Sequence, residues 1–400
     1  MAGALMQLVA YGAQDVYLTG NPQITFFKVV YRRHTNFAME SMQQTITGNN
    51  TLGGRGVCKL SRNGDLVGSC YVQSTVTQTT HSLNNRFGFN MLKNVELRIG
   101  GQKIDKHSNT WMLVWTNLSS SVNQSLLLDK MVGGSMSLAK NTLKGADPAA
   151  NADVTSVTVP LQFSFCRNPG LALPLIALQY HDVEIVIDYA SAAACGFNGA
   201  TGTTAISNTS LWVDYIFLDT EERKNFAQKP HEYLIETVQE QVHGVSGGSS
   251  NSIRLDFNHP VKELIWVGRD ADVNGDRFVN FTNAPAGNGE SFTDTVLKLN
   301  GQERFTTMDT KSNVDNSSKY FNYVQNYSYH TGTPLKGVNT YSFALKPEEH
   351  QPSGTCNFSR IDNATLNVKP STYIDQVTVM AHGYNILRVA SGMGGLAYSN

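Results

Sequence analysis

The chain carries many short stretches in which apolar and polar residues alternate. They are rich in Val, Ile, Thr and aromatic residues and cover residues 66–76, 94–99, 156–165, 183–189, 211–218, 233–242, 252–257, 263–268, 295–299, 341–345 and 376–387. A period of two residues is typical of strands that bury one face. Asn-Gly pairs at 63–64 and 300–301 fit the tight turns that join such strands. The pattern therefore predicts an all-β chain.

Helical patterns are few. HSNTWMLVWTNL (107–118) predicts a short helix opened by Ser108, and TEERKNFAQ (220–228) predicts a polar helix capped by Thr220. Many short strands with so few helices indicate sandwiches or barrels rather than units that alternate strand and helix.

One segment recurs at an offset of half the chain. NVELRIGGQK (94–103) and DTVLKLNGQE (294–303) share a leucine, a basic residue and a Gly-Gln pair at the same positions. A weaker echo relates residues 178–187 to 358–368. We interpret this as two tandem copies of one all-β domain joined around residues 219–230, each with about eight strands, the size of a jelly roll.

Charge and cysteine usage narrow the class of protein. Only 16% of the residues are charged, with 31 Lys and Arg against 32 Asp and Glu. A protein dedicated to nucleic acid would show a basic excess. The low charge instead favours a surface that neighbouring molecules cover. The five cysteines include no C-x-x-C pair, which indicates buried thiols in a reducing compartment. The first twenty residues hold no Lys or Arg, so we expect no secretory signal.

No catalytic motif is found. The ten histidines lack metal-binding spacings, and neither a G-x-S-x-G elbow nor a phosphate-binding loop occurs, so we expect no enzyme activity and no cofactor. The loop DADVNGDRF places Asp270, Asp272, Asn274 and Asp276 at alternate positions, as a calcium loop begins. Phe281 stands where the closing acid belongs, so an ordinary Asx-rich hairpin loop is the preferred interpretation.

Surface modification is a further candidate. Nine N-x-[ST] sequons occur, and those at Asn280, Asn316 and Asn326 are kept as candidate glycosylation sites. Without a secretory signal, chance occurrence in an Asn- and Ser-rich chain is the preferred interpretation. The adjacent acids Glu348 and Glu349 are expected to be solvated.

The segment FFKVVYRRHTNFAMES (26–41) interleaves aromatic and basic residues. Cations for phosphates and rings for bases are what a groove for single-stranded nucleic acid uses. No second basic patch continues the track, so the alternative is a contact segment for another protein. Phe27, Tyr31, Arg32 and Arg33 are the residues that we expect to carry such contacts.

Several long segments carry a resemblance to a known family. They include GALMQLVAYGAQDVYLTGNPQITFFKVVYRRHTNFAMES (3–41), VELRIGGQKIDKH (95–107), PGLALPLIALQYHDV (169–183), YSFALKPEEHQPSGTCNFSRIDNATL (341–366) and YNILRVASGMGGLAYSN (384–400). In these the chain resembles the major capsid proteins of nucleocytoplasmic large DNA viruses, with the closest likeness to those of algal (chlorella-type) phycodnaviruses. The likeness runs from one end of the chain to the other.

The resemblance implies a double jelly roll, two eight-stranded sandwiches in one chain. It also implies a homotrimer whose six jelly rolls form a nearly hexagonal tile of an icosahedral shell, around an internal membrane and a double-stranded DNA genome. The expected organisation is an inward-facing amino-terminal arm (1–25), a first jelly roll (26–218), a linker with a short helix (219–230), a second jelly roll (231–388) and a tail (389–400).

The resemblance implies partners as well. These are neighbouring capsomers, minor capsid proteins and the inner membrane, in a virion assembled in the host cytoplasm, with no direct specific nucleic-acid binding. In this family the surface loops carry glycans, and the corresponding regions here, roughly 131–155 and 270–294, are short. Two alternatives remain: a less abundant capsid paralogue, and a carbohydrate-binding jelly-roll protein.

Overall fold

The computed structural model describes residues 3–78, 84–134, 153–196, 204–270, 278–282, 291–304 and 319–398. The chain divides into two compact units, Met1–Asn36 and Phe37–Asn400. The first unit contains two short helices, α1 (Gly3–Val9) and α2 (Val16–Thr19), neither of which has a buried residue. Residues 26–36 contain no strand, so the first sandwich begins at Phe37, later than the expected start at 26.

The second unit opens with a sandwich of two antiparallel sheets. One sheet has the strand order β1-β10-β4-β7 and the other β3-β9-β5-β6, with the short strands β8 and β2 added at β4 and β3. The strands are β1 (Phe37–Thr45), β2 (Thr47–Gly48), β3 (Arg55–Lys59), β4 (Leu66–Gln78), β5 (Leu92–Ile99), β6 (Gln102–Ser108), β7 (Asp153–Pro160), β8 (Leu173–Pro174), β9 (Val183–Tyr189) and β10 (Thr204–Leu218). This is the first jelly roll.

A second sandwich repeats the same topology. Its sheets run β11-β19-β13-β16 and β12-β18-β14-β15, with β17 added at β13 and β20 at β19. The strands are β11 (His231–Gly244), β12 (Asn251–Arg254), β13 (Pro260–Asp270), β14 (Phe292–Leu299), β15 (Gln302–Glu303), β16 (Val338–Ser342), β17 (Cys356–Asn357), β18 (Ala364–Pro370), β19 (Ile374–Ala390) and β20 (Met393–Leu396). Each sandwich thus has eight principal strands among the described residues, paired in the same order, so the predicted double jelly roll is confirmed.

The repeated sequence segment forms the same hairpin in both sandwiches. β5 pairs with β6 and β14 with β15, and β5 and β14 have the same succession of buried and exposed positions. Both turns need two residues with positive φ, supplied by Gly100 (57°) and Gly101 (81°) in the first and by Asn300 (50°) and Gly301 (80°) in the second. The duplication inferred from the sequence is therefore visible in backbone geometry.

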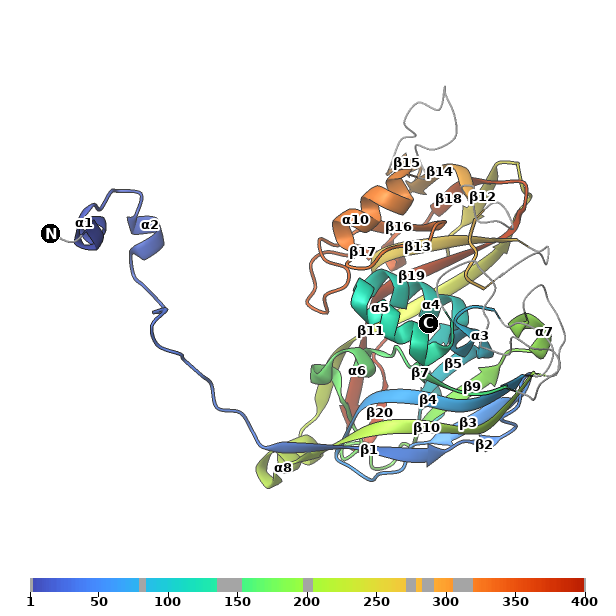
Figure 1. The fold of residues 1–400 in the computed structure, drawn as a ribbon, viewed down its shortest axis with the longest axis horizontal. Helices are drawn as coiled ribbons and strands as arrows, with labels where there is room; N and C mark the ends of the chain where they lie inside the picture. Colours follow the sequence, from blue (N-terminus) through green and yellow to red (C-terminus); the bar gives the residue numbers. More distant parts are fainter. Residues whose placement is uncertain are drawn as a thin grey trace. The chain divides into compact units, whose positions relative to one another are not determined.

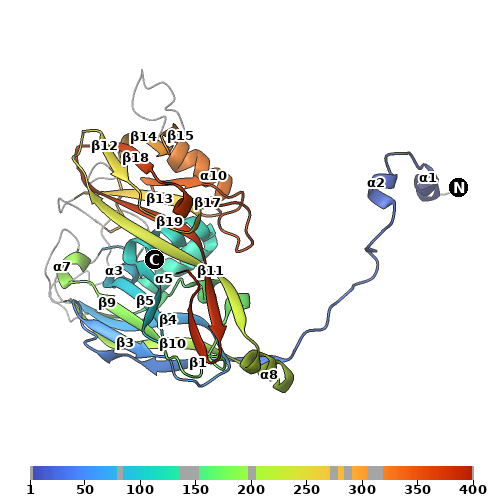
Figure 2. The same cartoon turned by 180° about the vertical axis from the view of Figure 1, so that it is seen from behind.

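Helices cluster in the connections between strands. Those of the second unit are α3 (Phe87–Met91), α4 (Asn109–Ser119), α5 (Val122–Val132), α6 (Ser164–Arg167), α7 (Ala192–Cys195), α8 (Thr220–Gln228), α10 (Gln325–Tyr329), the π-helical segment η3 (Lys319–Val324) and the 3-10 turns η1 (Pro169–Leu171) and η4 (Phe358–Arg360). In Figure 1 the strands β1, β10 and β4 lie at the bottom of the second unit, helices α4 and α5 lie near its middle, and β13, β18 and β14 lie toward its top. Figure 2 shows the same succession from behind. Helices α4 and α5 therefore lie between the two jelly rolls.

Two of the helices test the sequence predictions directly. Helix α4 is capped as expected, since Ser108 accepts a hydrogen bond from the backbone N–H of Trp111 at 3.1 Å. Helix α8 spans the predicted 220–228, but its cap position is Asp219 rather than Thr220. It fills the linker between β10 and β11.

The carboxyl end is not a free tail. Strand β20 pairs with β19 and also contacts the first jelly roll, where Gly392 accepts a hydrogen bond from the N–H of Tyr180 at 2.9 Å. The carbonyl of Gly394 lies 3.0 Å from Nδ1 of His181. A Cβ on Gly392, where φ is +80°, would meet the ring of Tyr180 at 2.4 Å, so this position requires glycine. The last described residues therefore fasten the second jelly roll to the first.

The described helices include none that is both long and apolar enough to cross a membrane. All five cysteines are free: Cys58, Cys70 and Cys195 are buried, while Cys166 and Cys356 are partly exposed.

Candidate functional site

Helix α4 is the central element of the junction between the jelly rolls. Every residue from Thr110 to Leu118 is buried. Trp111 and Trp115 stack on each other with ring centroids 5.2 Å apart, and Trp115 meets the ring of His382 on β19 edge-on at 4.5 Å. Arg269 on β13 donates a hydrogen bond to Thr110 Oγ1 at 2.9 Å. Aromatic packing and a polar contact thus join α4 to one sheet of the second jelly roll.

A buried polar network lies beside this helix and is centred on Glu236 of β11. Lys262 Nζ lies 2.6 Å from Glu236 Oε1, and an Arg167 nitrogen from the first jelly roll lies 2.9 Å from Oε2. His382 Nε2 approaches the same oxygen at 3.4 Å. Neither of the last two contacts has the geometry of a hydrogen bond. The network thereby reaches across the junction.

Glu263 of β13 extends the network. It accepts a hydrogen bond from His382 Nδ1 at 3.0 Å, and its second oxygen lies 3.1 Å from His330 Nε2. The other ring nitrogen of His330 lies 3.2 Å from Glu348, which also accepts a hydrogen bond from the N–H of Thr331 at 2.9 Å. Side chains from six segments are thus joined in one network of acids and bases.

The network is built to stay charged. Burial alone would raise the pKa of Glu236, but His350, His382 and Arg167 outweigh it and hold that pKa far below its usual range. Glu263 behaves alike, because His330 and His382 lower its pKa despite complete burial. Burial would lower the pKa of His330, yet Glu263 and Glu348 raise it to about 9. Paired charges of both signs are what makes such burial tolerable.

These shifts predict a pH dependence of stability. The carboxylates with lowered pKa values stabilise the fold above their ordinary value of 4.5, and this is lost as the pH falls below it. The contribution of His330 is complete below its ordinary value of 6.5 and is lost as the pH rises through about 9. We therefore expect the free energy of unfolding to be highest between about pH 4.5 and 6.5. Urea unfolding, followed by circular dichroism at one protein concentration, measures it. The His330→Gln variant should lose the alkaline fall; an identical fall in both proteins would contradict the assignment.

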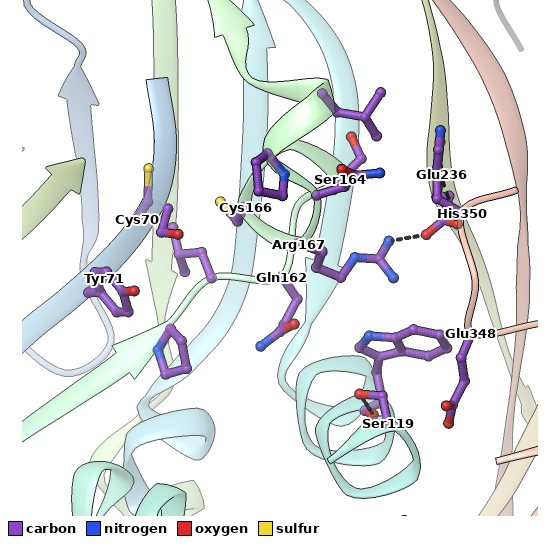
Figure 3. A pocket seen from close by; sticks show the side chains of 17 residues that line it. Cys70, Tyr71, Ser119, Gln162, Ser164, Cys166, Arg167, Glu236, Glu348 and His350 are labelled. Carbon is purple, nitrogen blue, oxygen red and sulfur yellow. Dashed lines mark hydrogen bonds and ion pairs between the residues drawn. The ribbon is translucent and has the colours of Figure 1, made fainter. Parts of the chain in front are cut away.

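A cavity of about 510 Å³ opens beside the network. Figure 3 shows Arg167 crossing it toward Glu236, with Cys70 and Tyr71 of β4 on the opposite wall. Ser119, on the helix below, donates its hydroxyl to the carbonyl of Trp115 at 2.8 Å. Within this lining, the ion pair of Arg167 with Glu236 joins the two jelly rolls.

The four arm residues that the sequence singled out lie in the first compact unit. Phe27 and Tyr31 are 97% and 81% exposed, and Arg32 and Arg33 are also exposed. They do not belong to the junction, which is built from the second unit.

The remaining sequence candidates divide into three groups. Asp270 ends β13, whereas Asp272, Asn274, Asp276 and Asn316 lie outside the described residues. Asn280 is half-buried, and its Oδ1 accepts hydrogen bonds from Thr282. Among the described residues, no group of three or more His, Cys, Asp or Glu side chains is arranged to hold a metal ion.

The candidate glycosylation residue Asn326 is buried. This residue is 1% exposed, because it lies on the inner side of α10. Its Nδ2 donates to the carbonyl of Asn322 at 2.5 Å and its Oδ1 accepts from Thr340 at 3.0 Å. A glycan would have to break both bonds.

The sequence analysis did not predict the polar network, and its expectation for one member of the network is wrong. Glu348 was expected to be solvated, but its side chain is only 19% exposed and is paired with His330. Its neighbour Glu349 fits the expectation, at 56% exposed. One signal was present: Lys262 and Glu263 interrupt an otherwise apolar strand, which indicates buried partners.

Comparisons with known proteins agree with this architecture. The family described as "Major capsid protein N-terminus" matches residues 25–219, and that described as "Large eukaryotic DNA virus major capsid protein" matches residues 222–395. The chain is 48% identical over 425 residues to the major capsid protein of Pyramimonas orientalis virus, and 41% identical over 457 residues to that of Paramecium bursaria Chlorella virus 1. Both alignments cover 100% of each chain.

Solved structures give the same result. A chain of the quasi-atomic model of the PBCV-1 virus capsid superimposes with a TM-score of 0.79 at 36% identity, over 94% of this chain and 100% of that one. The Faustovirus major capsid protein shares the fold with a TM-score of 0.71 at 14% identity, over 97% of this chain and 96% of that one. The chain belongs to the family of major capsid proteins of large eukaryotic DNA viruses, double jelly-roll proteins that form the virion shell.

Proposed function

We propose that three copies of this chain form a capsomer with six jelly rolls, which tiles an icosahedral shell as a nearly hexagonal unit. The observation that carries this proposal is the duplication itself. Two jelly rolls with the same strand order stand in one chain, so a threefold assembly presents six similar units. The low charged fraction of 16% suits a surface that is mostly covered by copies of itself.

Light scattering of the purified protein tests this assembly. A species of about three chain masses, stable on dilution to micromolar concentration, is the expected result. A strict monomer at all concentrations would contradict the proposal. A glycan array distinguishes a carbohydrate-binding protein, and quantification of the chain in purified virions distinguishes the principal subunit from a less abundant paralogue.

We further propose that the first compact unit is a contact arm for the shell interior. It combines exposed aromatic residues with the charges of Lys28, Arg32 and Arg33, the composition of a protein-contact segment. Its partners would be minor capsid proteins or neighbouring chains near the internal membrane. The neutral balance of the whole chain argues against a nucleic-acid track.

The double variant Arg32→Ala, Arg33→Ala is expected to impair shell assembly, because two cations available for pairing with acidic partners are removed. Assembly is followed by electron microscopy of particles produced with the minor capsid proteins. Affinity for single-stranded DNA, measured by fluorescence anisotropy at two salt concentrations, should hardly change. Tight, salt-sensitive DNA binding that the double variant abolishes would overturn the proposal.

A further inference from the structure

Two helical segments occupy the same place in the duplicated topology. Helix α4 lies in the connection from β6 to β7, and η3 with α10 lies in the connection from β15 to β16. Because the two jelly rolls pair their strands in the same order, these connections correspond.

The surroundings of the two segments differ. Helix α4 is covered on one side by its own jelly roll and on the other by the second one, where Trp115 meets His382. The segment η3–α10 is covered on one side only. Phe321 is fully buried against Trp266, with ring centroids 5.0 Å apart, whereas Val324 is 48% and Tyr327 is 91% exposed.

Within the chain, α4 packs on the outer face of the sheet β11-β19-β13-β16, the face turned away from the interior of the second sandwich. By the duplication, the corresponding surface of the first jelly roll is the outer face of the sheet β1-β10-β4-β7.

That outer face offers a suitable surface. Strand pairing aligns Gln43, Trp212, Tyr71 and Pro160 in a row across its four strands. The neighbours of Tyr71 and Trp212 along their strands are buried in the core, so these two side chains point outward, where they are half-buried. The row carries no charge, and the carboxylate of Asp214 nearby already accepts a hydrogen bond from the hydroxyl of Ser41.

We propose that the exposed face of η3 and α10, carrying Val324 and Tyr327, docks onto the row Gln43, Trp212, Tyr71 and Pro160 of a second copy of this chain. The contact between copies would then repeat the contact that α4 makes within the chain. Such a head-to-tail contact joins different surfaces of the two copies, and it forms a closed ring when the rotation between copies is that of a threefold axis. Tyrosine and tryptophan in an uncharged setting are typical anchors of such contacts. This inference rests on the proposed capsomer and names the surfaces that form it.

The first test is the variant Tyr327→Asp. Its matched control is Tyr373→Asp, because Tyr373 is also exposed, at 54%, but lies in the turn before β19 and outside the proposed contact. Mass photometry over a dilution series should give a dissociation constant about a hundredfold higher for Tyr327→Asp, because a charge is placed in an apolar contact. Tyr373→Asp should behave as the unmodified chain. Thermal melts verify that both variants are folded.

The second test does not depend on a disruptive variant. A photoreactive benzoylphenylalanine at position 327 is irradiated in a mixture of ¹⁴N- and ¹⁵N-labelled copies, and cross-linked peptides are identified by mass spectrometry. Mixed-isotope links from position 327 to β4 or β10 are the expected result.

The outcomes separate the two proposals. A stable trimer whose links from position 327 reach other surfaces, or that survives Tyr327→Asp undiminished, overturns this inference and leaves the proposed function intact. A chain that is strictly monomeric overturns both.

Discussion

Glu263→Ala is expected to lower the free energy of unfolding by about 3–5 kcal/mol. Glu263 is fully buried and contacts both His330 and His382. Its removal leaves the cationic His330 with Glu348 as its remaining acidic partner. Removing one of the two acidic partners of a buried cation costs far more than losing a surface pair. Urea unfolding followed by circular dichroism at pH 6.5 measures the difference.

The matched control for this variant is Glu349→Ala. Glu349 forms an ion pair with Lys346, in which both side chains are more than half exposed, so its loss should change stability by less than about 1 kcal/mol. Equal effects of the two variants would show that the buried network contributes nothing particular to the fold.

Trp115→Ala is expected to be about as damaging, with a loss of about 3–5 kcal/mol. Its side chain is 2% exposed and packs on Trp111, His382 and the guanidinium of Arg167, which lies 4.9 Å from the ring centre. Removal of the indole leaves an empty space at the junction between the jelly rolls. The two jelly rolls should therefore pack less tightly against each other, while each sandwich stays folded.

Hydrogen exchange locates this effect. Faster exchange in α4 and in the facing parts of β11 and β19, with β5 and β14 unchanged, is the expected pattern. Leu126→Ala on α5 serves as the control, because that side chain is 59% exposed and should be replaceable at little cost. Uniform acceleration through the whole chain would contradict an effect confined to the junction.

The sequence predicted best those strands that bury one face. In β5 and β14, buried and exposed residues alternate regularly, and both strands end in Gly-containing turns. Their assignment as strands and their equivalence in the two jelly rolls could therefore be predicted. β1 was missed because it is an edge strand. Most of its residues are exposed, and FAMESMQQT therefore shows no clear alternation.

Helix α5 was missed although it carried a readable signal. Ser121 and Gln124 form a capping box, the pattern that announces a helix start. Its apolar residues Leu126 and Leu127 are exposed, so the helix lacks the amphipathic pattern on which recognition depends.

The polar network lay beyond prediction for a different reason. Glu263, His330 and His382 come from separate segments of the chain. No regular spacing in the sequence relates them, and the internal duplication does not indicate that they pair. Charged residues within apolar strands indicate that partners exist, but which partners they are is decided by tertiary structure, such as the register of β13 and β19 that places Glu263 opposite His382.

The carboxyl-terminal strand has a consequence for biosynthesis. The groups that β20 contacts, Tyr180 and His181, are translated more than two hundred residues before it. The strands of the first jelly roll end at Leu218, so this jelly roll can form during translation, whereas its fastening to the second must wait until Gly392 and Gly394 have been made. Translation products that stop before Gly392 therefore lack these contacts.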